Sequence, residues 1–491
     1  MSLTLGHQSS IGISDPLSPF GAVISAQLTP VVQMDGIYGL NTEEHETFTA
    51  SGGSATVSSR LFTVSTGTSV GAYGVVRSKR VLRYRPGQGA IVRFTALYTT
   101  PVASSQQMAG AFNSEGGLFI GYNGTSFGVM RQYGGALEIQ TLTLSVAASG
   151  TESVTVTLNG VGSTFNLASG TTAANAATIA AQSYTGWNAY QNDGKVIFVA
   201  TAVGNKTNTF SFVNNTGGGT AAASFAETQA GAAHTEDWVY QTAFNVDKLD
   251  GTGPSAMTLD ATKGNVYQIS YQWLGFGNIN FSIVNPKTGQ FQVMHTFRYP
   301  NANTLASQNN PCYRIGWVAY SLGSTTNLTV QGASAAGFIA GTSASVRDSH
   351  SVTSSKTGIS TTYTNLVSVR SAAVLNGRVN FGQIYPILCS IACEGTKPAE
   401  FAIFINATVS GTQNWTSAAT HTAGEYDTTG TTVSGGTQIA GAALSKSGND
   451  RLDLTRFGLA LKLERTDVIT LAIRATSGTT DATASISWVD D

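Results

Sequence analysis

Side chains that could carry out chemistry are few and scattered in this sequence. The six histidines lie far apart, and no two of them have the spacing of a metal-ligand pair. No phosphate-binding loop, nucleophile elbow or His-Glu-x-x-His motif occurs. Paired carboxylates for glycoside hydrolysis meet only in space, and nothing in the sequence singles out a pair. We therefore expect no enzymatic activity, no catalytic residue, no metal and no cofactor.

Two acidic segments each allow two interpretations. Residues 43–46, Glu-Glu-His-Glu, could hold a cation or supply a general base, and the alternative is a solvated turn before a strand. Residues 247–253, Asp-Lys-Leu-Asp-Gly-Thr-Gly, resemble a calcium loop but lack its regular Asp/Asn alternation and closing Glu. Asp side chains that accept local amide hydrogens would explain the same residues. We favour the turn in both cases.

Two aromatic residues are candidates for ligand binding. Trp415 and Tyr426 lie in the long polar stretch 406–436, where loops place aromatic rings within reach of a ligand. The alternative is that both rings pack against their own loop. We expect any binding activity to lie in the C-terminal part of the chain that contains these two residues.

A basic segment lies between Thr47 and Ser114, where no Asp or Glu occurs. Its cationic residues are Arg60, Arg77, Lys79, Arg80, Arg83, Arg85 and Arg93. An anionic partner is one interpretation. The other is an edge strand protected by charge, or an ion-pair strip with the acidic segment 43–46 of another subunit. We favour the second, because the whole chain has a net charge of −1, and we expect no specific nucleic-acid binding.

The composition indicates which elements position these side chains. The chain has 491 residues, of which 55 are glycine and 11% are charged, whereas average soluble domains carry about 25% charged residues. Threonine is favoured on pleated sheets, and Gly and Asn supply turns. We predict an all-β, multi-domain protein of β-sandwich or jelly-roll type, long enough for about three domains.

Alternation with a period of two predicts hairpins in the first part of the chain. Residues 77–100 alternate around a turn signal at 86–89. Residues 117–135 alternate around Asn123 and Gly124, which are typical of a hairpin turn. Farther along the chain, we predict that Trp273 anchors the core of the same sandwich.

A change in composition at about residue 141 predicts an inserted domain. Charged residues become rare from 141 to 235, and the alanine-rich stretch 169–182 is predicted to be a helix with a Thr N-cap. After this region, the sequence again shows aromatic-rich predicted strands like those before residue 141. We therefore predict that 141–235 is a small α+β domain inserted into a loop of a β-sandwich.

The remaining boundaries follow from the positions of strands and of polar, Ser/Thr-rich sequence. The predicted domains are a β-sandwich of residues 1–140 plus 236–340, a linker at 341–362, and a C-terminal jelly-roll-like domain at 363–491.

The cysteine content excludes a disulfide framework. The chain has three cysteines, Cys312, Cys389 and Cys393. On a strand, Cys389 and Cys393 would share one face about 13 Å apart, too far for a bridge. We expect buried, reduced thiols. The sequence also lacks a secretory signal and any apolar run of the ~18 residues that cross a membrane, so we expect no membrane insertion.

Several motifs resemble a module of virion structural proteins from tailed bacteriophages and large DNA viruses. The similar segments are 16–33, 83–98, 244–260, 269–283 and 293–304, within about 10–140 and 236–340. The matching residues are Asp250, Gly251, Gly253, Ser255, Gln272, Trp273, Leu274, Gly275, Gly277, His295, Asn301 and Pro311. Asn278 departs from the pattern, which often has a basic residue there.

This resemblance implies a viral structural protein located in the virion, either on the capsid surface or in a tail appendage. It implies other virion proteins as partners, a homo-oligomer (a trimer or a larger array), and contact with host glycans. No catalytic residue is implied. The alternative is a carbohydrate-binding or carbohydrate-active β-sandwich protein.

Overall fold

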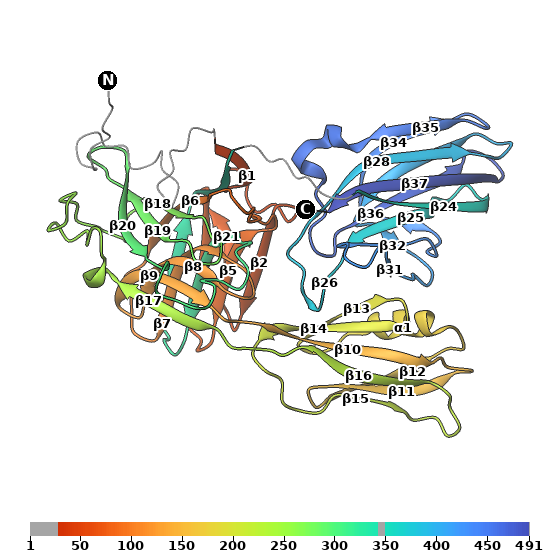
Figure 1. Cartoon of the computed structure of the whole chain (residues 1–491), viewed down its shortest axis with the longest axis horizontal. Helices are drawn as coiled ribbons and strands as arrows, with labels where there is room; N and C mark the ends of the chain where they lie inside the picture. Colours follow the sequence, from red (N-terminus) through yellow and green to blue (C-terminus); the bar gives the residue numbers. More distant parts are fainter. Residues whose placement is uncertain (1–27, 342–348, 491) are drawn as a thin grey trace. The chain divides into compact units, whose positions relative to one another are not determined.

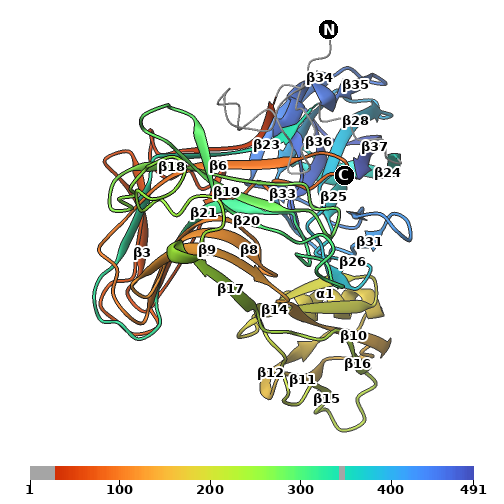
Figure 2. The same cartoon turned by 60° about the vertical axis from the view of Figure 1, so that its left-hand side comes forward.

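A computed structural model describes residues 28–341 and 349–490 of the chain. These residues form two compact units (Figures 1 and 2). Unit 1 consists of residues 28–135 and 234–341, and unit 2 consists of residues 136–233 and 349–490. Paired antiparallel strands dominate both units. The predicted fold class, all-β sandwiches with a small inserted α+β domain, is confirmed.

Unit 1 is a sandwich of two antiparallel sheets. In spatial order, the β6 sheet contains β20 (Phe291–Phe297), β19 (Ile279–Val284), β18 (Asn265–Tyr271), β6 (Ala90–Tyr98), β22 (Thr329–Gly332), β4 (Leu61–Ser65) and β3 (Ser54–Ser58), with β23 (Ser334–Ala340) beside β6 and β1 (Leu28–Asp35) beside β23. The β8 sheet contains β17 (Thr235–Tyr240), β9 (Ser126–Tyr133), β8 (Gly117–Asn123), β7 (Ser105–Phe112), β21 (Arg314–Ser321), β5 (Tyr73–Ser78) and β2 (His45–Ala50). The short helix η1 (Gln241–Ala243) follows β17. Alternate residues of both sheets bury a common apolar core.

Trp317 of β21 is the deepest aromatic anchor of this core. Its side chain is 0% exposed and its ring stacks on Phe62 with the centroids 5.0 Å apart. The indole Nε1–H donates to the carbonyl oxygen of Thr95 at 2.9 Å. Trp273, the anchor expected from the sequence, is only half-buried and packs against the edge of the core. The expectation that Trp273 is a central core residue was therefore wrong. Trp273 lies just beyond the end of β18, where strand alternation no longer places its side chain fully in the core.

One predicted hairpin is confirmed and the other is wrong. β8 ends at Asn123, and the two-residue loop of Gly124, which has a φ of 57°, and Thr125 leads into β9. The two halves of 77–100, however, lie in different sheets. β5 pairs with β2 and β21, whereas β6 pairs with β18, β22 and β23. The chain between them crosses the sandwich and buries Leu82 in the core, so it is a sheet-to-sheet connection rather than a hairpin turn.

The inserted part of unit 2 has two small sheets and a helix. The β14 sheet contains β13 (Trp187–Asn192), β14 (Lys195–Val203), β10 (Leu137–Val146) and β16 (Ala222–Gln229), and the β11 sheet contains β12 (Val161–Leu167), β11 (Glu152–Leu158) and β15 (Ser211–Asn214). The predicted helix is confirmed as α1 (Thr172–Ala180), whose N-cap Thr171 accepts the Ala174 amide. β10 begins before the predicted boundary at 141. Among the described residues, no helix has the length and apolar character needed to cross a membrane.

The buried carboxylate of Glu152 holds two loops of this inserted part together, at residues 149 and 220–221. Glu152 accepts backbone N–H groups from Ser149 (3.0 Å), Thr220 (3.0 Å) and Ala221 (2.8 Å), and the side-chain amide of Asn214 (2.7 Å). These hydrogen bonds, led by the backbone N–H groups of Thr220 and Ala221, hold the pKa of Glu152 far below its ordinary value of 4.5.

The substitution Glu152→Gln is therefore expected to lower the Tm at neutral pH, because an amide has one acceptor oxygen where the carboxylate has two. A depressed carboxylate pKa contributes stability that is complete above the ordinary pKa of 4.5 and is lost as the pH falls below it. The Tm gap between wild type and variant should narrow from pH 4.5 downward. Thermal melts across pH check this, with the exposed Glu227→Gln as control. A Tm difference between wild type and variant that stays constant with pH would contradict the lowered pKa of Glu152.

The C-terminal part of unit 2 is a second sandwich. Its β37 sheet contains β24 (Ser349–Ile359), β37 (Thr480–Asp490), β28 (Ile384–Cys393) and β35 (Asn449–Asp453). Its β36 sheet contains β31 (Thr416–Ser417), β32 (Gly424–Asp427), β25 (Thr364–Ser371), β36 (Val468–Ala475), β29 (Ala399–Ile405) and β34 (Thr437–Leu444). Short elements complete it: the pairs β26 (Val374–Leu375) with β27 (Arg378–Val379) and β30 (Thr408–Val409) with β33 (Val433–Ser434), and the helix η2 (Leu454–Leu461).

The predicted linker at 341–362 is wrong over residues 349–359. They form β24, which pairs with β37 along its length. The Ser/Thr-rich composition indicated a linker, but alternate residues such as Val352 turn toward the core and make a strand. Residues 342–348 of the predicted linker lie outside the described residues.

The cysteine expectation is confirmed for β28. Cys389 and Cys393 are buried on the core-facing side of this strand, and both thiols are free. Burial raises the pKa of Cys389 to about 12, so this thiol stays protonated and unreactive at neutral pH.

Candidate functional site

Trp415, a candidate ligand-binding residue, is 5% exposed. Within unit 2, its amide donates to Gln191 Oε1 at 2.8 Å, and its carbonyl accepts the Asp193 amide at 2.7 Å. The guanidinium carbon of Arg370 lies 4.3 Å from the ring centroid. These contacts agree with the packing alternative for Trp415.

Tyr426, the second candidate, lies in β32 opposite Thr416 of β31. Its side chain is half-buried and packs against the core of the C-terminal sandwich. The fold thus brings the two candidate residues onto neighbouring segments without turning both rings to solvent. Ligand binding by Trp415 and Tyr426 stays a prediction, and the packing of Trp415 disfavours it.

The acidic and basic segments of the first sandwich pair within one chain. Glu46 of β2 accepts a hydrogen bond from Arg77 Nε of β5 at 2.9 Å, so the ion pair needs no second subunit. In the segment 247–253, the Asp247 carboxylate accepts the amides of Leu249 and Ser255, as the turn interpretation predicts. No group of three or more His, Cys, Asp or Glu residues in the described ranges is placed to hold a metal.

A different set of polar and aromatic residues gathers on the outer face of the β8 sheet in unit 1. β17 lies at the end of this sheet beside β9 and β8 (Figures 1 and 2). Alternation along β17 turns Asp237 and Val239 inward and places Glu236, Trp238 and Tyr240 on the outer face. We call the β17 rim the set Gln106, Asn123, Gln132, Glu236, Trp238 and Tyr240.

Side chains from strands that are not neighbours meet on the outer face of the β8 sheet. Gln106 Nε2 of β7 donates to Glu236 Oε2 of β17 at 2.9 Å, across the two intervening strands. Three strand spacings of about 4.8 Å lie between β7 and β17, so this hydrogen bond depends on the length of both side chains. At Gly117 on the same face, a Cβ would lie 2.6 Å from the Phe119 ring. Phe119 and Trp238 belong to an apolar cluster on this face.

The rim combines a planar apolar surface with hydrogen-bonding groups. The rings of Trp238 and Tyr240 are stacked, with centroids 6.2 Å apart and planes 10° apart, and Tyr240 is 38% exposed. Glu236 is exposed and accepts hydrogen bonds from Gln132 Nε2 (3.4 Å) and Trp238 Nε1 (3.1 Å) as well as from Gln106. The Tyr240 hydroxyl accepts Asn123 Nδ2 at 3.1 Å. These bonds fix the orientation of the carboxylate and of both rings.

The carboxylates of this face do not form a hydrolytic pair. Among the described residues, Glu236 lies on the edge strand β17 and Glu46 on the opposite edge strand β2, with the remaining strands of the sheet between them. Glycoside hydrolases place their two carboxylates about 5–10 Å apart. The arrangement suits binding.

The β17 rim was missed by sequence reasoning, although the strand itself was recognised. The available signal was the pattern Glu-x-Trp-x-Tyr at 236–240, which places three functional side chains on one face of a strand. Such patterns are common in aromatic-rich β proteins. Only the partners Gln106 and Gln132, far away in sequence, distinguish this one.

Comparisons with known proteins are limited to distant likenesses between structures. No family model matches the chain, and no curated protein matches its sequence. The structure of a legume lectin-like domain from Entamoeba histolytica is 10% identical, covers 64% of this chain and 98% of its own, and has a TM-score of 0.27. LamAcat from Zobellia galactanivorans is 8% identical, with coverage of 63% and 97% and a TM-score of 0.27. Faustovirus major capsid protein is 8% identical, with coverage of 91% and 90% and a TM-score of 0.12. Likenesses at these TM-scores carry no argument about function.

Proposed function

We propose that this chain is a carbohydrate-binding β-sandwich protein and that the β17 rim binds the saccharide. The observation that carries the proposal is the stacked pair of half-buried Trp238 and exposed Tyr240 beside the fixed carboxylate of Glu236. A sugar ring has an apolar C–H face and a polar edge. The aromatic pair matches the face, and Glu236 with its amide neighbours matches the hydroxyl groups at the edge.

The substitution Trp238→Ala tests this proposal. It removes half of the aromatic surface and a donor to Glu236, and is expected to weaken saccharide binding about tenfold or more. Saturation-transfer NMR with a panel of bacterial-envelope and plant polysaccharides identifies a ligand, and calorimetry then compares variants. Glu236→Gln keeps the shape of the site and should also weaken binding, because a charge-assisted acceptor is lost.

Tyr38→Ala is the matched control, since Tyr38 is a highly exposed aromatic of the same unit outside the rim. Its binding should equal that of wild type. The proposal fails if no polysaccharide of the panel binds, or if Trp238→Ala binds as tightly as wild type while remaining folded. We further propose binding without turnover, so release of reducing ends from a bound polysaccharide would contradict that part.

A second proposal concerns the setting of this activity. We propose that the chain is a component of a virion surface or tail appendage, present as a homo-oligomer among other virion proteins. The motif resemblance over 10–140 and 236–340 supports it. Mass spectrometry of purified particles, with copy numbers, tests this proposal independently of any saccharide.

A further inference from the structure

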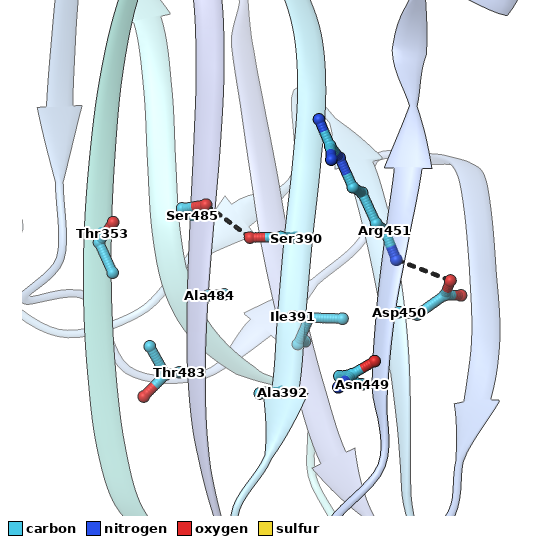
Figure 3. Close-up of a pocket in the computed structure, with 10 residues that line it drawn as sticks. All are labelled: Thr353, Ser390, Ile391, Ala392, Asn449, Asp450, Arg451, Thr483, Ala484 and Ser485. Carbon is cyan, nitrogen blue, oxygen red and sulfur yellow. Dashed lines mark hydrogen bonds between the residues drawn. The ribbon is translucent and has the colours of Figure 1, made fainter.

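The outer face of the β37 sheet in unit 2 carries a grid of hydroxyl groups. Residues directly opposite one another form rows across its strands. One row is Thr353, Ser485, Ser390 and Arg451, and the next is Ser355, Thr483, Ala392 and Asn449. Figure 3 shows members of both rows on neighbouring strands. The opposite face of the same strands buries the apolar core, so the hydroxyl grid faces away from it.

Four of the five hydroxyl groups of this grid form two pairs, and each pair retains capacity for a ligand. Ser390 Oγ and Ser485 Oγ are 2.7 Å apart, and Ser355 Oγ and Thr483 Oγ1 are also 2.7 Å apart. Each hydroxyl has one donor and two acceptor sites, so a pair that shares one hydrogen bond keeps one donor and three acceptors. The pairing also holds each hydroxyl in a fixed orientation.

The grid is hollowed around Ala392. A depression of about 410 Å³ is lined by the first row and by all of the second row except Ser355, together with Ile391, Asp450 and Ala484. This volume lies within the range of small-molecule sites, about 300–1,000 Å³. Ala392 has the smallest side chain of the two rows and forms the floor between Thr483 and Asn449. The charges at the depression, Asp450 and Arg451, offset each other.

We propose that this depression, the hydroxyl site, binds a neutral oligosaccharide. A neutral ligand with many hydroxyl groups can use the remaining donors and acceptors of the grid together with the Asn449 amide. A charged ligand would gain little net attraction, because the charges of Asp450 and Arg451 offset each other. An apolar ligand would desolvate the paired hydroxyl groups without replacing their hydrogen bonds. The inference goes beyond the proposed function, because the hydroxyl site lies in unit 2 and uses no residue of the β17 rim.

The test uses full-length protein that carries Trp238→Ala, so that binding at the β17 rim is reduced in every sample. Short gluco-, galacto- and manno-oligosaccharides are the probes, followed by saturation-transfer NMR and titration. At least one probe should bind. Ala392→Phe fills the depression without removing a hydroxyl and should weaken that binding about tenfold or more. Ser390→Ala, which removes one hydroxyl of a pair, should weaken it less.

Ser351→Ala is the matched control. Ser351 lies on the same face and shares a hydrogen bond with Ser487 at 3.1 Å, but it does not line the depression. Its binding should be unchanged. The proposal is overturned if no oligosaccharide binds the Trp238→Ala protein, or if Ala392→Phe binds as well as its parent. Neither outcome bears on the proposal that the β17 rim binds a saccharide, because that proposal is tested by comparing polysaccharide binding of wild type and Trp238→Ala.

Discussion

Trp317→Ala is expected to lower the free energy of unfolding of unit 1 by about 3–5 kcal/mol, the usual cost of truncating a buried aromatic residue. Trp317 is fully buried, stacks on Phe62 and donates to the Thr95 carbonyl oxygen. The substitution removes all three interactions and leaves a cavity between the two sheets. Urea denaturation gives the size of the loss, and hydrogen exchange with peptide mapping assigns it to unit 1.

Trp273→Ala is the comparison for this prediction. Trp273 makes an edge contact with Tyr84, their centroids 5.6 Å apart, and it is only half-buried. Its removal opens a smaller cavity, so the loss should be clearly smaller than for Trp317→Ala. Equal losses for the two variants would contradict the conclusion that Trp317 contributes more to the core than Trp273.

Glu425→Ala is expected to destabilise unit 2 by about 3–5 kcal/mol, because it leaves the buried guanidinium of Arg370 without its carboxylate partner. Glu425 Oε2 accepts Arg370 Nε at 2.7 Å, and the two side chains are 5% and 12% exposed. Its other oxygen accepts Asn192 Nδ2, and Arg370 also donates to the Gln191 carbonyl at 2.6 Å. The network joins the inserted part to β25 and β32, so both should lose protection in hydrogen exchange.

Glu400→Ala serves as the control for this ion pair. Glu400 and Arg474 also form an Arg–Glu pair, at 2.6 Å, but their side chains are 39% and 42% exposed. Solvent screens such a pair, so its loss should change stability little. A loss for Glu425→Ala no larger than for Glu400→Ala would mean that burial of the Arg370 pair is not what stabilises unit 2.

Local features of the fold could be predicted because they depend on neighbours in sequence. The helix at 172–180 follows from its alanine content and from Thr171 as N-cap. The hairpin between β8 and β9 follows from Gly124, which tolerates its positive φ of 57°. β24 was missed because its Ser/Thr-rich composition masked an alternation that is visible only once its inward residues meet a core.

The candidate sites could not be predicted, because their partners lie far apart in sequence. Glu236 is oriented by Gln106, and Trp415 is buried by contacts with Gln191 and Asp193. A sequence pattern shows which side chains share a face, but not what will cover that face. The stacked aromatic pair of the candidate site is therefore found on β17 rather than in the polar stretch 406–436.

The sequence by itself determined the all-β class, the inserted helix, the local turns and the burial of Cys389 and Cys393, since strand alternation and turn chemistry act over a few residues. Only the tertiary structure decided which strands became neighbours, which distant side chains meet on the outer face of the β8 sheet and which aromatic rings remain exposed. Those outcomes depend on how two sheets pack around one core. Burial of apolar surface between the sheets stabilises pairings of segments that are distant in sequence, and no local pattern specifies these pairings.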